Sequence, residues 1–480
     1  MAGGDQPKSE DKARVLQAFL TIEREETLFD KSNEGIYYWE LVRYQLYSKL
    51  LSSLGLQSVN ETGSRNYFDW ISYSLLQSIT GKSPSRAKKN SLLFFGHPRK
   101  KKENDLFVDI YTDPFIHFLS DNYEYSVLEG PLRPGFHCEP AYNYDVLYID
   151  YLLLRARTAA KLERKTLSQE TIRVCTQVQS QLEMKTGIQL NILSYIAASL
   201  ARYQHEFTAF KKLFLKTSPK AVFIVVSTDK EALIAAARSL SIPTIELQHG
   251  SPAKGKLNYD YPNNILKDTF PDYFFSFGEY WTRSVNFPIS EDRIIPVGFP
   301  YMELKKDKYR ETLEKKLDQI VFISQPTVFK DLATLALNVA EKANNKYKII
   351  YKMHPLEYDH FPELYNKLLH SGIHVYRDVK VDLYSLLAES KWQVGVYSTA
   401  LYEGIAFSCI TYILNTAGAE HMKPVIDNQQ AFLINDADEL LHSIDMSPDA
   451  PDGAQLFSPV DKDRLHFLID KICRHEKELY

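Results

Sequence analysis

The second half of the chain alternates short apolar runs with amphipathic segments, and this alternation constrains the fold more than any other feature. The apolar runs are typical of buried strands, which we expect at 319–324, 347–353, 374–376, 392–396 and 410–414. The segments between them have helical spacing and lie at 332–343, 361–369, 383–388 and 401–407. Strict alternation of this kind predicts a parallel, doubly wound sheet with right-handed crossovers.

A less regular version of the same pattern occupies the first half. Strands are predicted at 92–95, 105–111, 125–128, 146–149, 221–226, 244–247, 273–276 and 293–297. The stretch 161–215 contains no proline and predicts one or two long helices outside the sheet. We therefore predict an α/β protein with two Rossmann-like, parallel-sheet domains.

The segment 298–318 opens with Gly and Pro, becomes heavily charged, and is interpreted as the connection between the domains. The resulting division is a helical N-terminal extension at 1–90, a first sheet domain at 91–300, a second sheet domain at 301–460 and a C-terminal helix at 461–480. A chain of 480 residues is long enough for two cores.

Net charge and composition indicate which classes of binding partner and which cellular compartment to expect. The formal net charge is −4, so a nucleic acid partner is not expected. The basic runs at 86–89 and 99–102 are interpreted as solvated loops, with contact to an anionic membrane surface as the alternative. The N-terminus lacks a signal-peptide pattern, no apolar span approaches the roughly 20 residues that cross a bilayer, and the four cysteines show no paired spacing. We expect a cytoplasmic protein.

In the first predicted domain, Asp229 and His249 each follow a predicted strand. Asp229 comes after the apolar run 221–226, in a turn that we expect to cap the next helix, and His249 directly follows the strand at 244–247. Ligands of open parallel sheets bind beyond the carboxyl ends of the strands, so both side chains should face one crevice. A carboxylate and an imidazole there are candidate catalytic residues, with simple capping and turn roles as the alternative.

In the second predicted domain, three turns point to a phosphate site. Ser324 and Gln325 follow the first strand, His354 follows the second, and Ser398 and Thr399 precede a helix. A helix N-terminus offers free N–H groups and a partial positive charge, which together bind phosphate. Plain capping by the two hydroxyl residues is the common alternative.

One turn further along that helix, Glu403 is placed to accept hydrogen bonds from ribose hydroxyls. Donors at the phosphate stabilise a nucleotide leaving group without a metal ion. The chain has no GxGxxG or GxxxxGK[ST] sequence, which argues against a dinucleotide oxidoreductase and a P-loop ATPase. We therefore predict a nucleotide-activated substrate, with no cofactor and no metal site.

The chain resembles bacterial GT-B glycosyltransferases of capsule and lipopolysaccharide synthesis, a group akin to sialyltransferases, Kdo transferases and teichoic-acid glycerophosphotransferases. The resemblance covers roughly residues 90 to 450. It rests on the turns His249-Gly250 and His354-Pro355, the pair Ser398 and Thr399, and the segments 277–279 and 296–300. It implies a GT-B fold with two domains facing a cleft, a catalytic His249, and a nucleotide phosphate held by His354, Ser398 and Thr399.

The acidic-acidic-glycine element that carries the base in sialyltransferases has no clean match, so Asp229 is preferred as base or nucleophile by position. Glu246 and Asp260 are the next candidates. The expected activity is transfer of a sugar from a CMP- or other NDP-sugar donor to a glycan or lipid-linked glycan acceptor, at the inner face of the plasma membrane. Transfer of a polyol phosphate, sugar-nucleotide epimerisation and a non-catalytic glycan-binding scaffold are the alternatives. The sequence leaves inversion and retention open.

Overall fold

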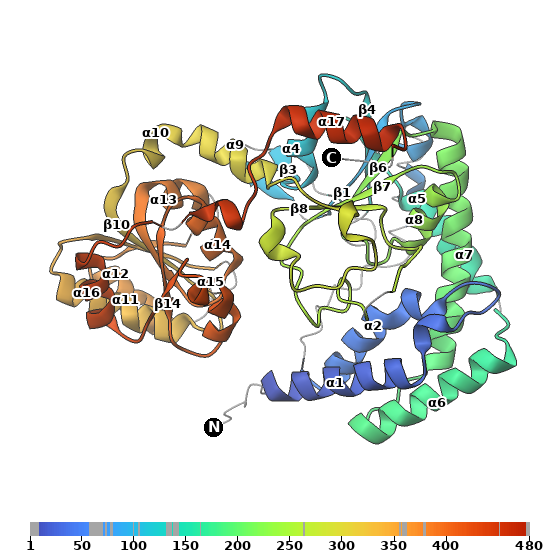
Figure 1. Ribbon diagram of the computed structural model, residues 1–480, viewed down its shortest axis with the longest axis horizontal. Coiled ribbons are helices and arrows are strands. Elements are labelled where there is room, and N and C mark those ends of the chain that lie inside the picture. The colour runs from blue at the N-terminus through green and yellow to red at the C-terminus, as the bar shows by residue number, and fades with distance from the viewer. Residues whose placement is uncertain are drawn as a thin grey trace. The chain divides into compact units, whose positions relative to one another are not determined.

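The computed structural model describes residues 9–56, 71–72, 74–76, 80–98, 100–103, 106–130, 137, 144–163, 165–262, 265–354, 357, 362–377, 381–450 and 452–476. The chain forms two compact units. The first comprises Met1–Ser276, Thr282–Ile295 and Asp461–Tyr480, and the second comprises Phe277–Trp281 and Pro296–Val460. Each unit is built around its own parallel sheet (Figure 1). The predicted α/β fold with two Rossmann-like parallel sheets is confirmed.

The first unit contains a seven-stranded sheet in the order β5-β4-β1-β6-β7-β8-β9. Its strands are β1 (Leu92–Gly96), β4 (Tyr125–Glu129), β5 (Val146–Tyr148), β6 (Ala221–Val225), β7 (Thr244–Leu247), β8 (Tyr273–Ser276) and β9 (Ile294–Pro296). The pairs from β5 to β8 are parallel. Val225 of β6 lies opposite Leu247 of β7, so the segments after these two strands leave the sheet at one edge.

Helices cover the sheet because its central strands are apolar on both faces. Every residue of β6 is buried, as expected for a continuous apolar run in a parallel sheet. The helices of this unit outside the N-terminal segment are α4 (Thr112–Leu119), α5 (Asp150–Leu162), α6 (Gln169–Thr186), α7 (Ile192–Thr217), α8 (Glu231–Arg238) and α17 (Lys462–Cys473). The strand predicted at 105–111 is only β3 (Leu106–Val108), which pairs antiparallel with β2 (Lys101–Glu103) outside the main sheet.

The N-terminal segment packs as a helical layer against part of the first unit. Helices α1 (Ser9–Glu25) and α2 (Tyr38–Ser53) lie beside α6 and α7 (Figure 1) and share an apolar core with them. Arg43 of α2 is 1% exposed and is paired with Glu23 of α1, through Nε–Oε1 and Nη2–Oε2 distances of 2.6 and 2.9 Å. The residues predicted as helical at 57–70 lie outside the described part of the chain.

The second unit contains a six-stranded, fully parallel sheet in the order β12-β11-β10-β13-β14-β15. Its strands are β10 (Leu317–Ile323), β11 (Lys348–Lys352), β12 (His374–Tyr376), β13 (Ser390–Gly395), β14 (Ile410–Leu414) and β15 (Phe432–Ile434). Its helices are α9 (Pro300–Lys308), α10 (Arg310–Leu313), α11 (Phe329–Ala343), α12 (Pro362–His370), α13 (Leu383–Glu389), α14 (Thr399–Ala406), α15 (Lys423–Asp427) and α16 (Ala437–Asp445). The predicted alternation of strands and helices is present throughout.

The segment interpreted as an interdomain connection is instead largely helical and part of the second unit. Helix α9 has Pro300 at its first position, where proline has no hydrogen bond to lose and its fixed φ suits a helix. Just before it, Gly298 has a φ of 83°, and a side chain there would meet the carbonyl oxygen of Ser458 at 2.3 Å. The glycine in this segment is therefore required by close backbone packing.

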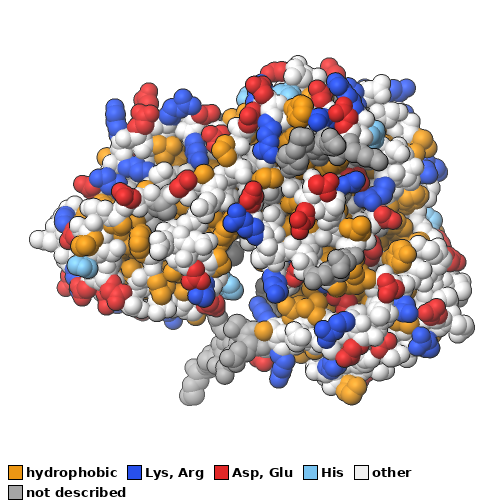
Figure 2. Space-filling view, viewed as in Figure 1, with side chains coloured by type: hydrophobic (Ala, Val, Ile, Leu, Met, Phe, Trp, Pro, Cys, Tyr) orange, Lys and Arg blue, Asp and Glu red, His pale blue; other side chains and the backbone are white. Residues whose placement is uncertain are grey.

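Acidic and basic side chains are interspersed over the visible face in Figure 2, in keeping with the small net charge. Within the described residues, no helix combines the length and the apolar character needed to span a membrane. Three of the four cysteines are described, Cys175, Cys409 and Cys473, and these are free thiols.

Candidate functional site

The turn after β7 places His249 at the carboxyl edge of the first sheet. The backbone N–H of Gln248 donates to the carbonyl of Phe275 at 3.0 Å, and its side-chain amide donates to the carbonyl of Gly250 at 2.7 Å. Gln248 therefore ties the turn to β8 and closes it on itself. The imidazole of His249 is half-buried at this edge.

His249 belongs to a hydrogen-bonded chain that begins at a buried carboxylate. The hydroxyl of Tyr259 donates to Oε1 of Glu246 at 2.6 Å and lies 3.3 Å from Nδ1 of His249. Glu246 is fully buried in β7, and Tyr259 is 3% exposed. Burial raises the pKa of Glu246, although the hydrogen bonds from Tyr259 and Ser227 act to lower it. Burial also raises the pKa of Tyr259 well above its usual value.

This geometry assigns the tautomer of His249. Because Tyr259 stays protonated and gives its proton to Glu246, its oxygen is available to accept the Nδ1–H of His249. Nε2 then carries the lone pair of the neutral ring. An imidazole oriented in this way is suited to accept a proton from a substrate hydroxyl.

A second histidine and a tyrosine lie beside His249. The ring of His97, which directly follows β1, stacks on that of His249 with centroids 6.1 Å apart, and Tyr111 places its ring edge-on to both. The backbone N–H of His97 donates to Oδ2 of Asp109 at 2.5 Å. Asp109 is fully buried and its Oδ2 lies 3.4 Å from Nζ of Lys100, so a buried ion pair holds the His97 loop.

The N-terminal helices hold the loop that carries Tyr259. Nη1 of Arg43 donates to the carbonyls of Leu257 and Asp260 at 2.7 and 2.8 Å, on either side of Tyr259. The carboxylate of Asp260 accepts the backbone N–H groups of Gly255 at 2.7 Å and Asn286 at 3.1 Å. Asp260 therefore fastens the loop, and Arg43 connects it to the helical layer.

Asp229 lies after β6 and is engaged by two other side chains. Its Oδ1 accepts hydrogen bonds from Nη2 of Arg202 and Nε2 of Gln45, both at 2.9 Å. Burial acts to raise the pKa of Asp229, but the charge and hydrogen bond of Arg202 outweigh it and the pKa is lowered. The expected capping role is wrong, because Lys230 occupies the N-cap position of α8 and no side chain caps that helix.

In the second unit, the loops after β10 and β13 are joined. Nε2 of Gln325 donates to the carbonyl of Tyr397 at 3.1 Å, and the N–H of Tyr397 reaches Oε1 of Gln325 at 3.4 Å. Ser398 caps α14 by accepting the N–H of Ala400 at 3.3 Å, and Thr399 is exposed at the first turn. Hydroxyls and a helix N-terminus therefore lie together at the carboxyl edge of this sheet.

His354, which follows β11, is connected to Ser324 through a buried carboxylate. Glu357 accepts the backbone N–H of His354 at 2.8 Å and the hydroxyl of Ser324 at 2.9 Å. Ser324 is 3% exposed, and its buried hydroxyl helps to hold the Glu357 carboxylate that fixes the His354 turn. Burial, followed by the charge of Lys352, lowers the pKa of His354, which leaves its imidazole neutral near pH 7. Pro355 lies outside the described residues.

Glu403, one turn into α14, is half-buried and interacts with the hydroxyl of Tyr384 on α13. The charge of Glu403 and this hydrogen bond add to burial in raising the pKa of Tyr384. The roles predicted for Glu403, Gln325 and the other site residues remain predictions.

Sequence reasoning missed His97, Tyr111 and Tyr259. His97 follows a predicted strand directly, so the rule that singled out His249 also applied to it. Tyr259 had no such signal, since it lies in a loop and reaches Glu246 only through the folded backbone.

No protein-family model matches the sequence, and no curated protein does either. Several solved structures are similar to the chain. A UDP-GlcNAc 2-epimerase from Neisseria meningitidis bound to UDP-GlcNAc is 12% identical over 77% of this chain and 94% of its own, with a TM-score of 0.45. The wall teichoic acid polymerase TagF is 14% identical over 91% and 98%, with a TM-score of 0.44. The S. aureus MnaA-UDP co-structure is 12% identical over 82% and 98%, with a TM-score of 0.40. Such low TM-scores carry no inference about the chemistry of this chain.

Proposed function

We propose that this protein is a transferase that moves a sugar from a nucleotide-activated donor to the hydroxyl of a glycan acceptor. The observation that carries the proposal is the chain Glu246–Tyr259–His249 at the carboxyl edge of the first sheet. It supports His249 as the general base, because it fixes the ring and leaves Nε2 as acceptor. The resemblance to GT-B transferases at the His249-Gly250 turn supports the same role.

In the proposed reaction, Nε2 of His249 takes the proton of the acceptor hydroxyl while the oxygen attacks the anomeric carbon of the donor. The bond between that carbon and the phosphate oxygen breaks, and the nucleotide leaves with the bonding electrons. Ser398, Thr399 and the N-terminus of α14 hold the phosphate, and His354 donates an N–H to it. Direct attack of this kind inverts the anomeric centre.

The finer assignments rest on the resemblance and the composition. We propose a CMP- or other NDP-sugar as donor, a surface polysaccharide or lipid-linked glycan of the capsule or lipopolysaccharide type as acceptor, and action at the cytoplasmic face of the membrane. Neither a metal ion nor a cofactor takes part in the proposed step, since the donors named above supply the charge stabilisation.

Transfer of a polyol phosphate is the second candidate, and one observation favours it. The carboxylate of Asp229, which a retaining or carboxylate-dependent glycosyl transfer would use, is paired with Arg202. The imidazole of His249 is the better base, and a His-Gly turn with a catalytic histidine is the feature that resembles glycerophosphotransferases. In that reaction the same proton transfer precedes attack on phosphorus rather than on carbon.

A thermal-shift screen against CMP, CDP, UDP and GDP tests the proposal. A nucleotide at a hundredfold excess over its dissociation constant stabilises the folded protein by about 2.7 kcal/mol, which a melting curve detects. Labelled sugar and polyol donors that carry the stabilising nucleotide are then tested in a single-turnover assay with wild type and His249→Ala.

Transfer of a sugar that is lost in His249→Ala supports the first candidate, and transfer of a polyol phosphate supports the second. Interconversion of the donor without an acceptor would identify an epimerase. The absence of a response to every nucleotide would overturn both transferase candidates in favour of a scaffold.

A further inference from the structure

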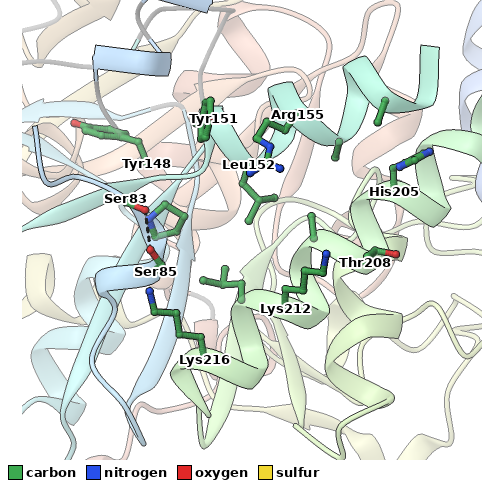
Figure 3. Close-up of a pocket in the computed structure, with 15 residues that line it drawn as sticks. Ser83, Ser85, Tyr148, Tyr151, Leu152, Arg155, His205, Thr208, Lys212 and Lys216 are labelled. Carbon is green, nitrogen blue, oxygen red and sulfur yellow. Dashed lines mark hydrogen bonds between the residues drawn. The ribbon is translucent and has the colours of Figure 1, made fainter. Parts of the chain in front are cut away.

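A cavity of about 530 Å³ lies on the first unit between α5, α7 and the short 3-10 helix η2 (Pro84–Arg86). Figure 3 shows Leu152 and Arg155 on α5, Lys212 and Lys216 on α7, Ser83 at the N-cap of η2 and Ser85 within it. These residues take no part in the site described above. The cavity is open enough to admit a ligand from solvent and is lined by two kinds of side chain.

The polar part of the lining is positively charged. Among the described residues that line the cavity, the basic ones are Arg155, His205, Lys212 and Lys216, and none is an aspartate or a glutamate. His205 is paired with Glu163 at 2.6 Å, whereas the other three form no salt bridge within the described part of the chain. Three uncompensated cations around one cavity favour an anionic ligand.

The remaining part of the lining is apolar. Leu152, Ala156 and Ala159 of α5 face Ala209 and Leu213 of α7 across the floor of the cavity. Two exposed leucines lie on the same two helices: Leu162 is 83% exposed, one turn beyond Ala159 on α5, and Leu215 is 62% exposed, one position before Lys216 on α7. A free phosphate would use the cations alone, so the apolar floor and the exposed leucines indicate a ligand with a hydrocarbon part.

The basic run at 86–89 continues from the wall of the cavity. Arg86 ends η2, and both Arg86 and Lys89 are exposed, while Lys88 is paired with Glu124. The run therefore adds positive charge beside the cavity, on the segment that supplies Ser83 and Ser85. This continuity explains a sequence feature that the transfer chemistry leaves unused.

We propose that this cavity binds the phosphate headgroup and the first methylene groups of an anionic phospholipid, and so attaches the first unit to a membrane surface. Arg155, Lys212 and Lys216 bind the phosphate, the apolar floor covers the start of the chains, and Leu162 and Leu215 insert at the surface. The inference does not depend on the transferase activity, and it specifies the site and the lipid chemistry of membrane attachment.

The test is co-sedimentation of the full chain with vesicles of phosphatidylcholine, with and without phosphatidylglycerol. Wild type should bind only the mixed vesicles. Each basic residue near an anionic surface contributes on the order of 1 kcal/mol, so the triple variant Arg155→Gln, Lys212→Gln, Lys216→Gln should bind roughly 100-fold more weakly.

A matched control removes one arginine and two lysines elsewhere on the first unit. These are Lys12 on α1 and Arg173 and Lys185 on α6, which are all exposed. The control variant, with glutamine at these positions, should bind mixed vesicles nearly as well as wild type. Equal losses in the two triple variants would overturn the proposal, because they would indicate diffuse electrostatic attraction.

A third variant tests the cavity without changing charge. Ala159→Phe fills the apolar floor, so it should weaken vesicle binding while the melting curve shows a folded protein. Unchanged vesicle binding by this variant would overturn the proposal, as would binding of soluble glycerol 3-phosphate as tight as that of mixed vesicles. A nucleotide thermal shift measured on the same variants separates this result from the transferase proposal.

Discussion

Replacing Tyr259 by phenylalanine removes the oxygen that links Glu246 to His249 and leaves the ring in place. The ring packs against Phe274 and Phe287 with centroid distances of 5.7 and 5.8 Å, and these contacts survive in Tyr259→Phe. The variant therefore creates no large cavity. Any effect that is measured reports on the hydroxyl alone.

The first expected effect is on stability. Glu246 is fully buried and loses a donor at 2.6 Å, which costs about 1–3 kcal/mol of the free energy of unfolding. Because burial already raises the pKa of Glu246 and the Tyr259 hydrogen bond opposes that rise, the pKa should rise further in the variant. A carboxyl group with a raised pKa binds more protons in the folded state, so its contribution to stability falls as pH rises from about 4.3, the unfolded value. The difference between variant and wild type should therefore grow from acid to neutral pH.

The second expected effect is on the tautomer of His249. Loss of one hydrogen bond to Nδ1–H is worth about 0.5–1.5 kcal/mol, which shifts the tautomer ratio by about 2- to 10-fold towards Nε2–H. Nitrogen NMR of protein with ¹⁵N-labelled histidine distinguishes the two tautomers, and His249→Gln identifies the resonance. Since a general base contributes about 10²- to 10⁴-fold, we expect single-turnover transfer to fall at least tenfold in Tyr259→Phe and further in His249→Gln.

The reasoning would be refuted if Tyr259→Phe left both the His249 tautomer and the rate of transfer unchanged in a folded protein. A double-mutant cycle with Glu246→Gln adds a separate criterion. Because the two residues act through one hydrogen-bonded chain, their effects on the rate should be less than additive. Full additivity would mean that Glu246 and Tyr259 act independently.

Four further predictions concern the two sheet edges. His354→Ala should lower nucleotide affinity about tenfold or more. Burial and the charge of Lys352 lower the pKa of His354, whereas a bound phosphate favours its imidazolium form. The affinity of wild type should therefore rise relative to that of the variant as pH falls below about 6.5. Asp229→Asn should keep the fold, because Asn tolerates the φ of 66°, and should reduce transfer far less than loss of the His249 imidazole. Gly404→Ala should cost about 1–3 kcal/mol of stability and weaken nucleotide binding, because its Cβ would lie 2.0 Å from Oε1 of the buried Gln393 that supports α14. Transfer should survive chelation by EDTA, since the proposed step uses no metal ion.

Each of these has a direct measurement. Nucleotide affinity is measured by calorimetric titration of His354→Ala and of the control His370→Ala, which alters an exposed histidine on α12. Equal affinities in the two variants would contradict a phosphate contact by His354. A hundredfold loss of single-turnover transfer in Asp229→Asn would instead make that carboxylate the base or nucleophile. An unshifted melting curve for Gly404→Ala would show that α14 tolerates the extra carbon. Activity lost in EDTA and restored by magnesium or manganese would contradict metal-independent transfer.

The order of strands and helices followed from the sequence because it depends on local periodicity. Runs such as 221–225 and 320–323 are apolar at successive positions, which is typical of a strand buried on both faces. The same patterns placed His249, His354 and Ser398 at strand ends, and parallel pairing then brings such ends to one edge of each sheet. Sequence alone thus determined the two sheets and where their polar turns lie.

Local sequence signals mislead where a polar segment has two interpretations. The charge of the segment after Gly298 favours a linker, whereas Pro300 at a first helical position and the helix-forming residues that follow favour the observed α9. Asp229 was expected to cap α8, yet its side chain is drawn to Arg202, a partner 27 residues earlier on α7. A charged partner from another element outcompeted the local hydrogen bond.

The chemistry of the candidate site was decided by tertiary structure. Tyr259 reaches Glu246 and His249 because Arg43, more than 200 residues earlier in the chain, fixes the carbonyls on both sides of it. His97 meets His249 because β1 and β7 flank β6 in the sheet, a neighbourhood set by crossover connections. Periodicity along a chain specifies which residues are buried, but it does not specify which distant groups share a hydrogen bond. That pairing is fixed only when packing brings the donors and acceptors together and burial makes an unpaired group costly.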